Sequence, residues 1–395
     1  MPARLTPRGL RHLRSGHPWV YANDLTVDDA EPGALVPVED PAGHVVAWGL
    51  YSPVSKIRVR LVSRGPGEPG AQFWRERVER AVALRSQHGL LHPDGACRLV
   101  SGDADGIPGL VVDLYAGVCV LQSGTHAADR LRDEVVEHVR ASLPFALRAI
   151  YERSDASVRR LEGLEPRAGL LAGELPSELV VREDDLSYEV DVRAGHKTGH
   201  YLDQRENRRR AAALARGAAV LDAFSYDGLF GIRAALAGAR SVLCVDQSAE
   251  ALERALRNAE RNGVGHLVRT ERANAMRDLR DRAAAGERFG LVVLDPPAFA
   301  RNRRELPGAE RGYRELNLRA LRLLEPGGHL VSASCSHAVR PELFLAFLAR
   351  AAADWGRDAW LERLEGAAPD HPVLLTLPES AYLKCAFVRA GEPRS

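Results

Sequence analysis

Two reactive side chains follow short apolar runs in the C-terminal half of the chain. Asp295 follows LVVL and opens the turn DPPAF (295–299), and Cys335 follows HLVSAS. A thiolate can add to a substrate carbon when positive charge or dipoles lower its pKa. A carboxylate can stabilise the charge that such an addition creates. If the two runs are neighbouring strands, about 4.8 Å apart, both side chains open into one crevice.

The two prolines after Asp295 fix the backbone and remove two amide donors. The carbonyl groups that remain can face a planar base that carries donor groups. A Pro-Pro pair is also an ordinary turn, so this motif by itself leaves both interpretations open.

Two more acids belong to apolar runs: Asp222 in VLDAF (220–224) and Asp246 in SVLCVD (241–246). Ligands of an open α/β sheet bind beyond the carboxyl ends of its strands, where an acid can accept both hydroxyls of a ribose. Neither G-x-G-x-x-G nor G-x-x-x-x-G-K-[ST] occurs in the region of these runs, from residue 183 onward, which disfavours a dinucleotide-dependent dehydrogenase. A nucleoside ligand without a pyrophosphate fits this pattern better than a dinucleotide does, and S-adenosylmethionine is such a ligand.

The elements that position these residues alternate between strands and helices from about residue 183. Four runs have strand length and are apolar, as buried parallel strands are: 220–224, 241–246, 291–295 and 329–335. A helix is expected over 248–263, with Ser248 as its N-cap and Gly263 as its stop. Residues 183–395 are therefore predicted to form a doubly wound α/β domain.

Two smaller domains precede it. The runs LVPVED, HVVAWGLYS and KIRVRLVS predict a small β-barrel-like domain over residues 1–67. The stretch GPGEPGAQ (65–72) is a linker by composition. Helical patterns over 73–89 and 126–143, with strand-like runs around them, predict an α+β middle domain over residues 73–182 without a catalytic constellation.

The composition limits the class of protein. A chain of 395 residues with 45% hydrophobic and 27% charged residues is typical of a globular protein of two or three domains. No run approaches about eighteen apolar residues, and no continuous apolar segment follows the N-terminus, so a cytoplasmic location is expected. The five cysteines include no C-x-x-C pair, and no metal site is expected. All except Cys335 lie in or beside strand-like runs and are expected in the core.

Basic residues gather in two places. The first 23 residues combine arginines such as Arg11 with His17 and Trp19, which suits RNA, although a solvated helix face explains the charge equally well. The stretch RNRRELPGAERGYRELN (301–317) is predicted to be a basic loop that collects phosphates, with a solvated loop as the alternative. The first arginines of this loop are Arg301, Arg303 and Arg304.

Nearly end to end, the chain resembles the bacterial 23S ribosomal RNA cytosine-carbon-5 methyltransferases of the methyltransferase I type. These enzymes join an N-terminal PUA RNA-binding domain, a middle α+β domain and a class I, Rossmann-like S-adenosylmethionine-dependent domain. The most specific matches are GHKTGHYLDQR (195–205) and its order relative to DPPAF and SASCS (332–336). Further matching stretches are GHPWVY (16–21), GLYSPVSKIRVR (49–60), DGIPGLVVD (105–113), YERSD (151–155), LDAFSYDGLFG (221–231), DHPV (370–373) and PESAYLK (378–384).

The resemblance implies roles for particular residues. Cys335 is expected to be the nucleophile, and Asp295 to lie between the methyl donor and the base. The residues expected to hold the cofactor are Tyr201, Gln204, Asp222, Phe224, Ser225, Tyr226, Gly228, Asp246, Gln247, Asn274 and Asp295. The residues expected to contact RNA are Arg11, His17, Trp19, Lys197, Arg301, Arg303 and Arg304. The expected partner is 23S ribosomal RNA, free or in a large-subunit assembly particle, and the oligomeric state, monomer or homodimer, stays open.

Three positions depart from the family pattern. Ala298 stands where relatives often have Lys, and His337 where many have Gly, which leaves the base-side contacts and the target nucleotide open. Asn274 stands where an acid would bind the adenine amino group, and its amide oxygen can accept the same hydrogen bond. The base that removes the carbon-5 proton is not identified, and His337 is the one candidate considered.

Two alternatives remain. A class I methyltransferase acting on an exocyclic base amine also uses an Asp-Pro-Pro turn, but it needs no cysteine and expects an aromatic residue directly after the prolines, where Ala298 precedes Phe299. A non-catalytic RNA-binding ribosome-assembly factor would keep the fold as a scaffold and would not bind S-adenosylmethionine.

Overall fold

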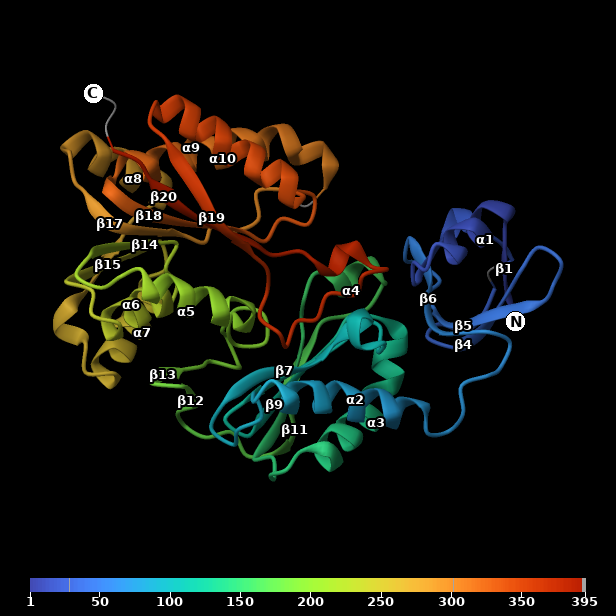
Figure 1. Ribbon diagram of the computed structural model, residues 1–395. Helices are drawn as coiled ribbons and strands as arrows, with labels where there is room; N and C mark the ends of the chain where they lie inside the picture. Colours follow the sequence, from blue (N-terminus) through green and yellow to red (C-terminus); the bar gives the residue numbers. More distant parts are fainter. Residues whose placement is uncertain (28, 301, 393–395) are drawn as a thin grey trace. The chain divides into compact units, whose positions relative to one another are not determined.

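The computed structural model describes residues 1–27, 29–300 and 302–392 (Figure 1). The chain divides into two compact units. The first comprises Met1–Glu183, Val190–Leu202 and Pro369–Ser380, and the second comprises Asp184–Glu189, Asp203–Ala368 and Ala381–Ser395. Among the described residues, no helix is both long and apolar enough to cross a membrane.

The first unit begins with a six-stranded sheet in the order β2-β6-β5-β4-β1-β3. Its strands are β1 (Ala3–Leu5), β2 (Trp19–Tyr21), β3 (Leu25–Val27), β4 (Leu35–Glu39), β5 (Val45–Tyr51) and β6 (Ile57–Arg64). Helix α1 (Pro7–Arg14) begins after Thr6, whose Oγ1 accepts a hydrogen bond from Gly9 N at 3.0 Å. The three strand-like runs expected between residues 35 and 63 form β4, β5 and β6.

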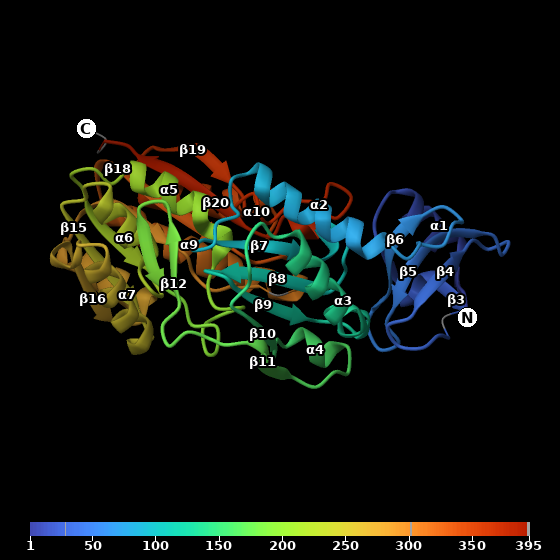
Figure 2. The ribbon, with the colours of Figure 1, turned by 90° about the horizontal axis from the view of Figure 1, so that it is seen from below.

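The rest of the first unit is built on a five-stranded sheet in the order β11-β10-β9-β8-β7. The strands are β7 (Ala96–Ser101), β8 (Leu110–Tyr115), β9 (Val118–Ser123), β10 (Ala149–Ser154) and β11 (Arg167–Gly173). Helices α2 (Phe73–Gln87) and α3 (His126–Ser142) lie beside this sheet (Figure 2). Valines of both helices, such as Val78 and Val135, share one core with the sheet. Strand β12 (Val180–Glu183) belongs to the first unit, and strand β13 (Leu186–Glu189) belongs to the second.

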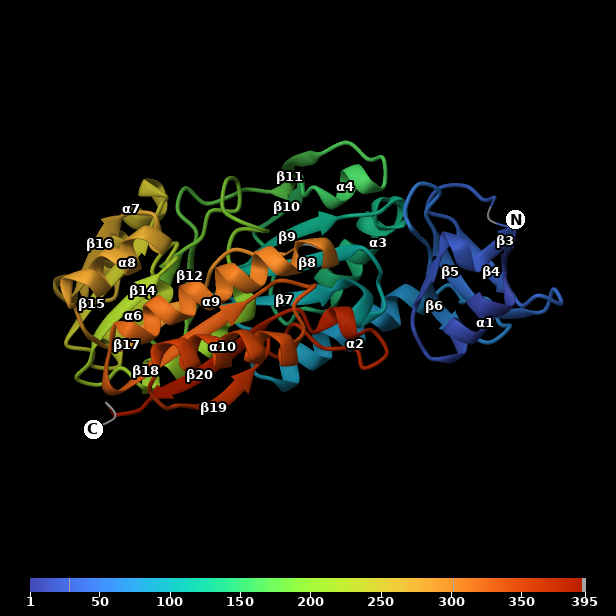
Figure 3. The same ribbon diagram turned by 90° about the horizontal axis from the view of Figure 1, so that it is seen from above.

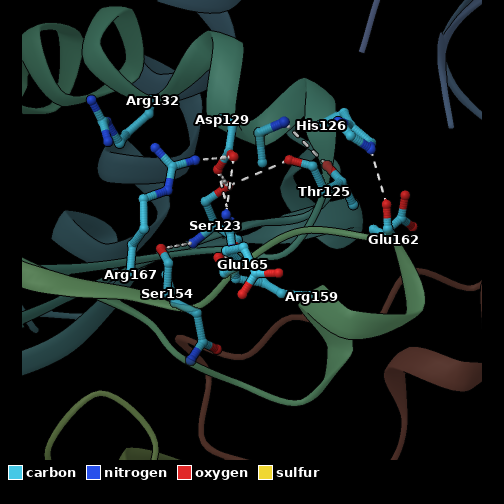
Figure 4. Close-up of polar contacts among 12 residues, drawn as sticks. Ser123, Thr125, His126, Asp129, Arg132, Ser154, Arg159, Glu162, Glu165 and Arg167 are labelled. Carbon is cyan, nitrogen blue, oxygen red and sulfur yellow. Dashed lines mark hydrogen bonds and ion pairs between the residues drawn. The ribbon is translucent and has the colours of Figure 1, made fainter. Parts of the chain in front are cut away.

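A polar network fixes the short helix α4 (Val158–Leu161) to the start of α3 (Figure 4). Arg159, almost fully buried, donates to Asp129 Oδ1 at 2.8 Å and Oδ2 at 3.1 Å. Ser123 Oγ donates to the same carboxylate at 2.5 Å. Although burial opposes it, these hydrogen bonds lower the pKa of Asp129. The network therefore joins the end of β9 and the helix α4 to the start of α3.

A second buried network fixes two loops of the first unit. Arg85, which is fully buried, donates to both carboxylate oxygens of Asp105, at 2.9 and 2.8 Å, and to the carbonyl of Asp370 at 2.8 Å. Asp370 Oδ2 accepts from Arg98 N at 2.9 Å, and Arg98 forms a bidentate ion pair with Asp113 at 2.8 and 2.9 Å.

The same network reaches the segment 190–202. Thr198 Oγ1 donates to Asp113 Oδ2 at 2.5 Å and lies 2.8 Å from the hydroxyl of Tyr115. The motifs GHKTGHY and DHPV are thus held by one set of buried charges on β7 and β8.

The second unit has a seven-stranded sheet in the order β16-β15-β14-β17-β18-β20-β19, in which β20 is antiparallel to both neighbours. The strands are β14 (Ala219–Ala223), β15 (Ser241–Asp246), β16 (Val268–Arg272), β17 (Phe289–Leu294), β18 (Leu324–Ser334), β19 (Ala359–Glu365) and β20 (Lys384–Ala390). One face carries α5 (Arg205–Ala213), α6 (Leu229–Leu236) and α7 (Ala249–Arg261), and the other carries α8 (Ala275–Ala285), α9 (Leu306–Arg322) and α10 (Pro341–Trp355) (Figure 1); Figure 3 shows the second face from above. This is the doubly wound architecture that the sequence predicts.

The sequence also predicts how α7 begins and ends. Ser248 Oγ accepts a hydrogen bond from Ala251 N at 3.2 Å, and Gly263 follows the helix at φ +71°.

One element was predicted wrongly. Residues 301–317 are not a loop along their whole length, because α9 begins at Leu306. Pro307 lies in the first turn, where no intrahelical donor is lost, and Tyr313 and Leu316 are fully buried against the sheet. Arg314 points away from that core and pairs with Asp354.

Replacing Arg85 with Met is expected to lower the free energy of unfolding by about 3–5 kcal/mol, because the carboxylate of Asp105 loses its buried partner. Arg130, which forms an exposed ion pair with Glu31 at 3.3 Å, provides the matched control, and its change to Met should cost less than about 1 kcal/mol. Urea denaturation measures both. Equal losses would show that the buried network contributes no more than a surface pair.

Candidate functional site

The predicted catalytic residues follow neighbouring strands of the second unit. Strands β17 and β18 pair in parallel, with Leu294 opposite Ser332, so Asp295 and Cys335 both leave the sheet at its carboxyl edge. Strand β14 pairs with the other side of β17, with Ala223 opposite Leu294. The turn after Asp222, the DPPAF turn and the Cys335 segment therefore follow three adjacent strands.

The turn from Asp222 to Gly228 has a strained backbone. Phe224 (φ +62°) and Tyr226 (φ +50°) adopt the left-handed region, which side chains rarely occupy and which clusters at ligand sites. Gly228 (φ +76°) has no room for a side chain, since a Cβ there would lie 2.9 Å from Ala255 Cβ.

Asp246 fixes this turn from the end of β15. Its Oδ2 accepts from Tyr226 N and its Oδ1 accepts from Ser248 N, both at 2.9 Å. The carboxylate therefore stands at one orientation at the sheet edge and still has lone pairs for the hydroxyl groups of a ligand.

Asp222 is a buried acid among other acids. Burial, together with the charges of Asp295, Asp246 and Asp227, raises its pKa to about 8, against a hydrogen bond from Gly231 N at 2.9 Å. Three other carboxyl groups thus act on Asp222 near the ends of β14, β15 and β17. Such a grouping disfavours an anionic ligand and favours one that carries positive charge or hydroxyl donors.

Two buried polar atoms of this unit fit such a ligand. Asp222 Oδ1 and Gln204 Nε2 are inaccessible to solvent and have no hydrogen-bond partner among the described residues. Buried polar atoms of proteins are normally paired, so an unpaired acid oxygen beside the strained turn and an unpaired amide nitrogen just before α5 fit a bound molecule with both donor and acceptor groups. S-adenosylmethionine has such groups in its ribose, adenine and amino-acid parts.

The remaining residues expected at the cofactor have different surroundings. Ser225 is buried, and Gln247 is exposed directly after β15. Asn274 caps α8, because its Oδ1 accepts from Arg277 N at 3.1 Å. Tyr201 belongs to the first unit, where its hydroxyl lies 2.9 Å from His196 Nδ1 and its ring lies 4.5 Å from Lys197 Nζ.

Cys335 differs from the other cysteines of the chain. It is partly exposed, whereas the other four are buried. Burial raises the pKa of Cys119 to about 12 and the pKa of Cys244 and Cys385 well above the ordinary thiol value. A buried neutral thiol is a poor nucleophile, so Cys335 is the cysteine suited to chemistry.

Three residues around Cys335 were given no role by the sequence: Tyr313, Ser336 and Lys384. Lys384 is almost fully buried, and Nζ donates to the carbonyls of Ser336 and Tyr382, both at 2.8 Å. Burial lowers its pKa to about 8, against the opposing effect of the Cys335 thiolate. The stretch PESAYLK contains this lysine, but its contact with Cys335 depends on the pairing of β20 with β18.

His337 lies on the exposed side of the Cys335 segment. Its ring stacks on that of Tyr382, with centroids 5.4 Å apart, and the Tyr382 hydroxyl donates to Asp203 Oδ2 at 2.6 Å.

The residues expected to contact RNA lie in three places. Arg11 is exposed on α1, and Lys197 is exposed in the loop that the buried arginine network holds. His17 and Trp19 are partly buried, since His17 stacks on His12 at 4.9 Å and the Trp19 indole donates to Asp103 at 2.7 Å. In the second unit, Arg303 and Arg304 are exposed in a short 3-10 turn before α9, and Arg301 lies outside the described residues.

Comparisons with known proteins agree with this arrangement. Residues 3–64 match the PUA-like domain family, and residues 164–387 match the S-adenosylmethionine-dependent methyltransferase family. A protein of Shewanella frigidimarina called ribosomal RNA large subunit methyltransferase I is 40% identical over 98% of both chains. Proteins of the same name from Shewanella denitrificans and Aeromonas hydrophila are 41% and 40% identical, over 98% and 96% of this chain.

Two solved structures share the fold. The protein SMU.776, described as a methyltransferase and crystallised with SAH, has a TM-score of 0.85 at 21% identity and covers 98% of this chain and 100% of its own. A protein from Streptococcus mutans described as an S-adenosylmethionine-dependent methyltransferase has a TM-score of 0.83 at 20% identity, with the same coverage.

The raised pKa of Asp222 predicts a pH dependence of stability. Its pKa is about 8 in the folded protein and 3.8 ordinarily, so between these values the folded state binds one proton more than the unfolded state. The free energy of unfolding then falls as the pH rises, by about 1.4 kcal/mol per pH unit from this group. Asp222→Asn removes the titration, so the wild type should lose stability relative to the variant as the pH rises from about 5 to about 8.

Urea denaturation at several pH values measures this difference, and the comparison of two proteins cancels the titration of all other groups. A stability difference that stays constant across the pH range would contradict the raised pKa of Asp222.

Proposed function

Because the chain belongs to the methyltransferase I family of ribosomal RNA large subunit methyltransferases, we propose that it methylates carbon 5 of a cytosine in 23S ribosomal RNA through a covalent adduct of Cys335. The observation that supports this most is the partly exposed thiol at the end of β18, one strand away from Asp295. A methyltransferase acting on an exocyclic amine needs no thiol there.

The proposal follows from the weak nucleophilicity of cytosine carbon 5. Addition of Cys335 Sγ to carbon 6 moves the electrons of the 5,6 double bond to carbon 5, which then acts as a nucleophile. When bound, S-adenosylmethionine supplies a methyl group on a sulfonium, which is the electrophile that carbon 5 needs. Transfer of the carbon-5 proton to a base and expulsion of the Cys335 thiolate restore the double bond.

Asp295 is suited to stabilise the base during the addition. A carboxyl group next to the ring can form a hydrogen bond to the ring nitrogen or to the exocyclic amine, where charge changes as the adduct forms. The prolines that follow keep the segment extended and leave its carbonyl groups without competing amide donors.

The cofactor is assigned to residues of the second unit. Asp246 is oriented to accept hydrogen bonds from the ribose, and the turn from Asp222 to Gly228 approaches the ligand with its backbone. The unpaired Oδ1 of Asp222 adds a hydrogen-bonding group close to this turn, which is a donor while the carboxyl group is protonated. The remaining candidates of this unit are Gln204, Ser225, Gln247 and Asn274.

RNA is assigned to basic residues of both units. A base inside a duplex cannot reach a thiol at a sheet edge, so the target cytosine must be single-stranded or flipped out. Arg11 and Lys197 in the first unit and Arg303 and Arg304 in the second are exposed cations able to bind the flanking phosphates. The PUA-like domain carries the aromatic residues His17 and Trp19, which suit contacts with unstacked bases.

Replacing Cys335 with Ala should abolish methyl transfer to 23S ribosomal RNA while the affinity for S-adenosylhomocysteine changes less than about twofold, because the thiol acts on the base and not on the cofactor. Mass spectrometry of nuclease-digested RNA and calorimetry measure the two properties. Cys385→Ala, in the buried neighbouring strand, serves as the control that retains activity. Substantial formation of 5-methylcytosine by Cys335→Ala would exclude the covalent route.

An RNA that carries 5-fluorocytosine at the target should form a stable adduct with the wild-type protein, since fluorine cannot leave as a proton. The adduct should resist denaturation, migrate as one band in gel electrophoresis and be absent with Cys335→Ser. A methylated exocyclic amine without any adduct would favour the alternative reaction.

A further inference from the structure

Ser336 stands where the two catalytic segments meet. It follows Cys335 directly and is fully buried. Its Oγ accepts hydrogen bonds from Phe299 N at 3.0 Å and Ala300 N at 3.3 Å. These amides close the DPPAF turn, four and five residues after Asp295. One hydroxyl group therefore joins the turn that carries the carboxylate to the segment that carries the thiol.

The directions of the hydrogen bonds show that the one donor site and both acceptor sites of the Ser336 hydroxyl are occupied. The single O–H of Tyr313 donates to Ser334 Oγ at 2.8 Å. The contact of 3.0 Å between the oxygens of Tyr313 and Ser336 must then be donated by Ser336. Its two lone pairs are left for the two amides. Alanine at this position would leave the buried amide of Ala300 and the partly buried amide of Phe299 without this acceptor.

The surroundings hold Ser336 from two more sides. Lys384 Nζ donates to its carbonyl at 2.8 Å, from the strand β20 that pairs with β18. The ring of Phe299 packs on that of Tyr313, with centroids 4.7 Å apart, and lies over Gly312, where a Cβ would approach it to 3.0 Å. The turn is thus fixed by its hydrogen bonds to Ser336 and by the packing of the Phe299 ring on Tyr313. Of these two, the contact with Ser336 lies next to Cys335.

We infer that Ser336 is a positioning residue. It holds the turn that begins at Asp295 in place relative to Cys335, so that the carboxylate and the thiol can both reach the same base. This inference rests on the proposed function, since it concerns the reaction that needs both groups. Ser336 does not touch the reacting atoms and acts through the Phe299 and Ala300 amides. A misplacement of about 1 Å costs on the order of 10²-fold in rate, because the reacting groups lose their aligned geometry.

The test compares two buried serines of the same strand end. Ser336→Ala is expected to lower the single-turnover rate of methyl transfer about 10²-fold, while the dissociation constants for S-adenosylhomocysteine and RNA change less than about twofold. Ser332 is equally buried, and its Oγ has no partner among the described residues, so Ser332→Ala should keep the wild-type rate. A purely structural role of Ser336 would weaken cofactor binding and slow the reaction together.

A second variant tests the network. Tyr313→Phe removes the acceptor of the Ser336 hydroxyl but leaves the hydroxyl, so it should slow transfer less than Ser336→Ala. The double variant should be no slower than Ser336→Ala, because both changes act through one hydrogen-bond chain.

Hydrogen exchange of residues 298–300, which follow the two prolines, can be measured by mass spectrometry and gives a readout that needs no substrate. The amides of Phe299 and Ala300 should exchange faster in Ser336→Ala and keep wild-type protection in Ser332→Ala. If Ser336→Ala does not fold, Tyr313→Phe takes its place in the test. The inference then requires both faster exchange of the Phe299 and Ala300 amides and slower methyl transfer in Tyr313→Phe.

Unchanged protection, or a rate within about threefold of the wild type in Ser336→Ala, would overturn the inference. Equal losses of rate and cofactor affinity would also overturn it. A wild-type protein that forms no 5-methylcytosine would refute the proposed function and with it the positioning role, whereas amide exchange would still show whether Ser336 holds the turn.

Discussion

The parallel pairing of β17 with β18 is the interaction on which the candidate site depends. Its register, with Leu294 opposite Ser332, directs Asp295 and Cys335 to one edge of the sheet. Both strands are lined by closely packed, buried apolar side chains, so a shift in register would force these side chains to repack. The position of the reactive residues is therefore fixed by the burial of residues that take no part in chemistry, and local contacts such as that of Ser336 refine it.

Burial also sets the chemical state of the polar groups near that edge. It raises the pKa of Asp222 and Tyr313 and lowers the pKa of Lys384, because a medium of low polarity disfavours every charged form. Cys335 remains partly exposed, and the other four cysteines are buried. The site thus combines one accessible thiol with buried acids and a buried amine. Hydrogen bonds from these buried groups to a ligand are stronger than the same hydrogen bonds in water.

In the first unit, buried charged residues hold loops in place. Arg85 and Arg98, with Asp105 and Asp113, satisfy one another and the backbone near Asp370, so that two loops distant in the sequence keep one conformation. A buried ion pair is costly to break, because the remaining partner keeps its charge without compensation. This explains why loops with little apolar surface can hold exposed residues such as Lys197 at a defined place.

The sequence by itself determined the strands and helices whose pattern is local: the apolar runs before Asp295 and Cys335, and the cap and stop of α7. It also singled out Cys335, because its place at a strand end is readable from neighbouring residues. The tertiary structure decided what depends on distant contacts. The stretch 301–317 is predicted to be a basic loop, yet α9 begins at Leu306, with Tyr313 fully buried against the sheet. The contacts of Ser336 with Phe299 and Lys384 exist only because β17, β18 and β20 are adjacent, and no sequence pattern encodes that adjacency.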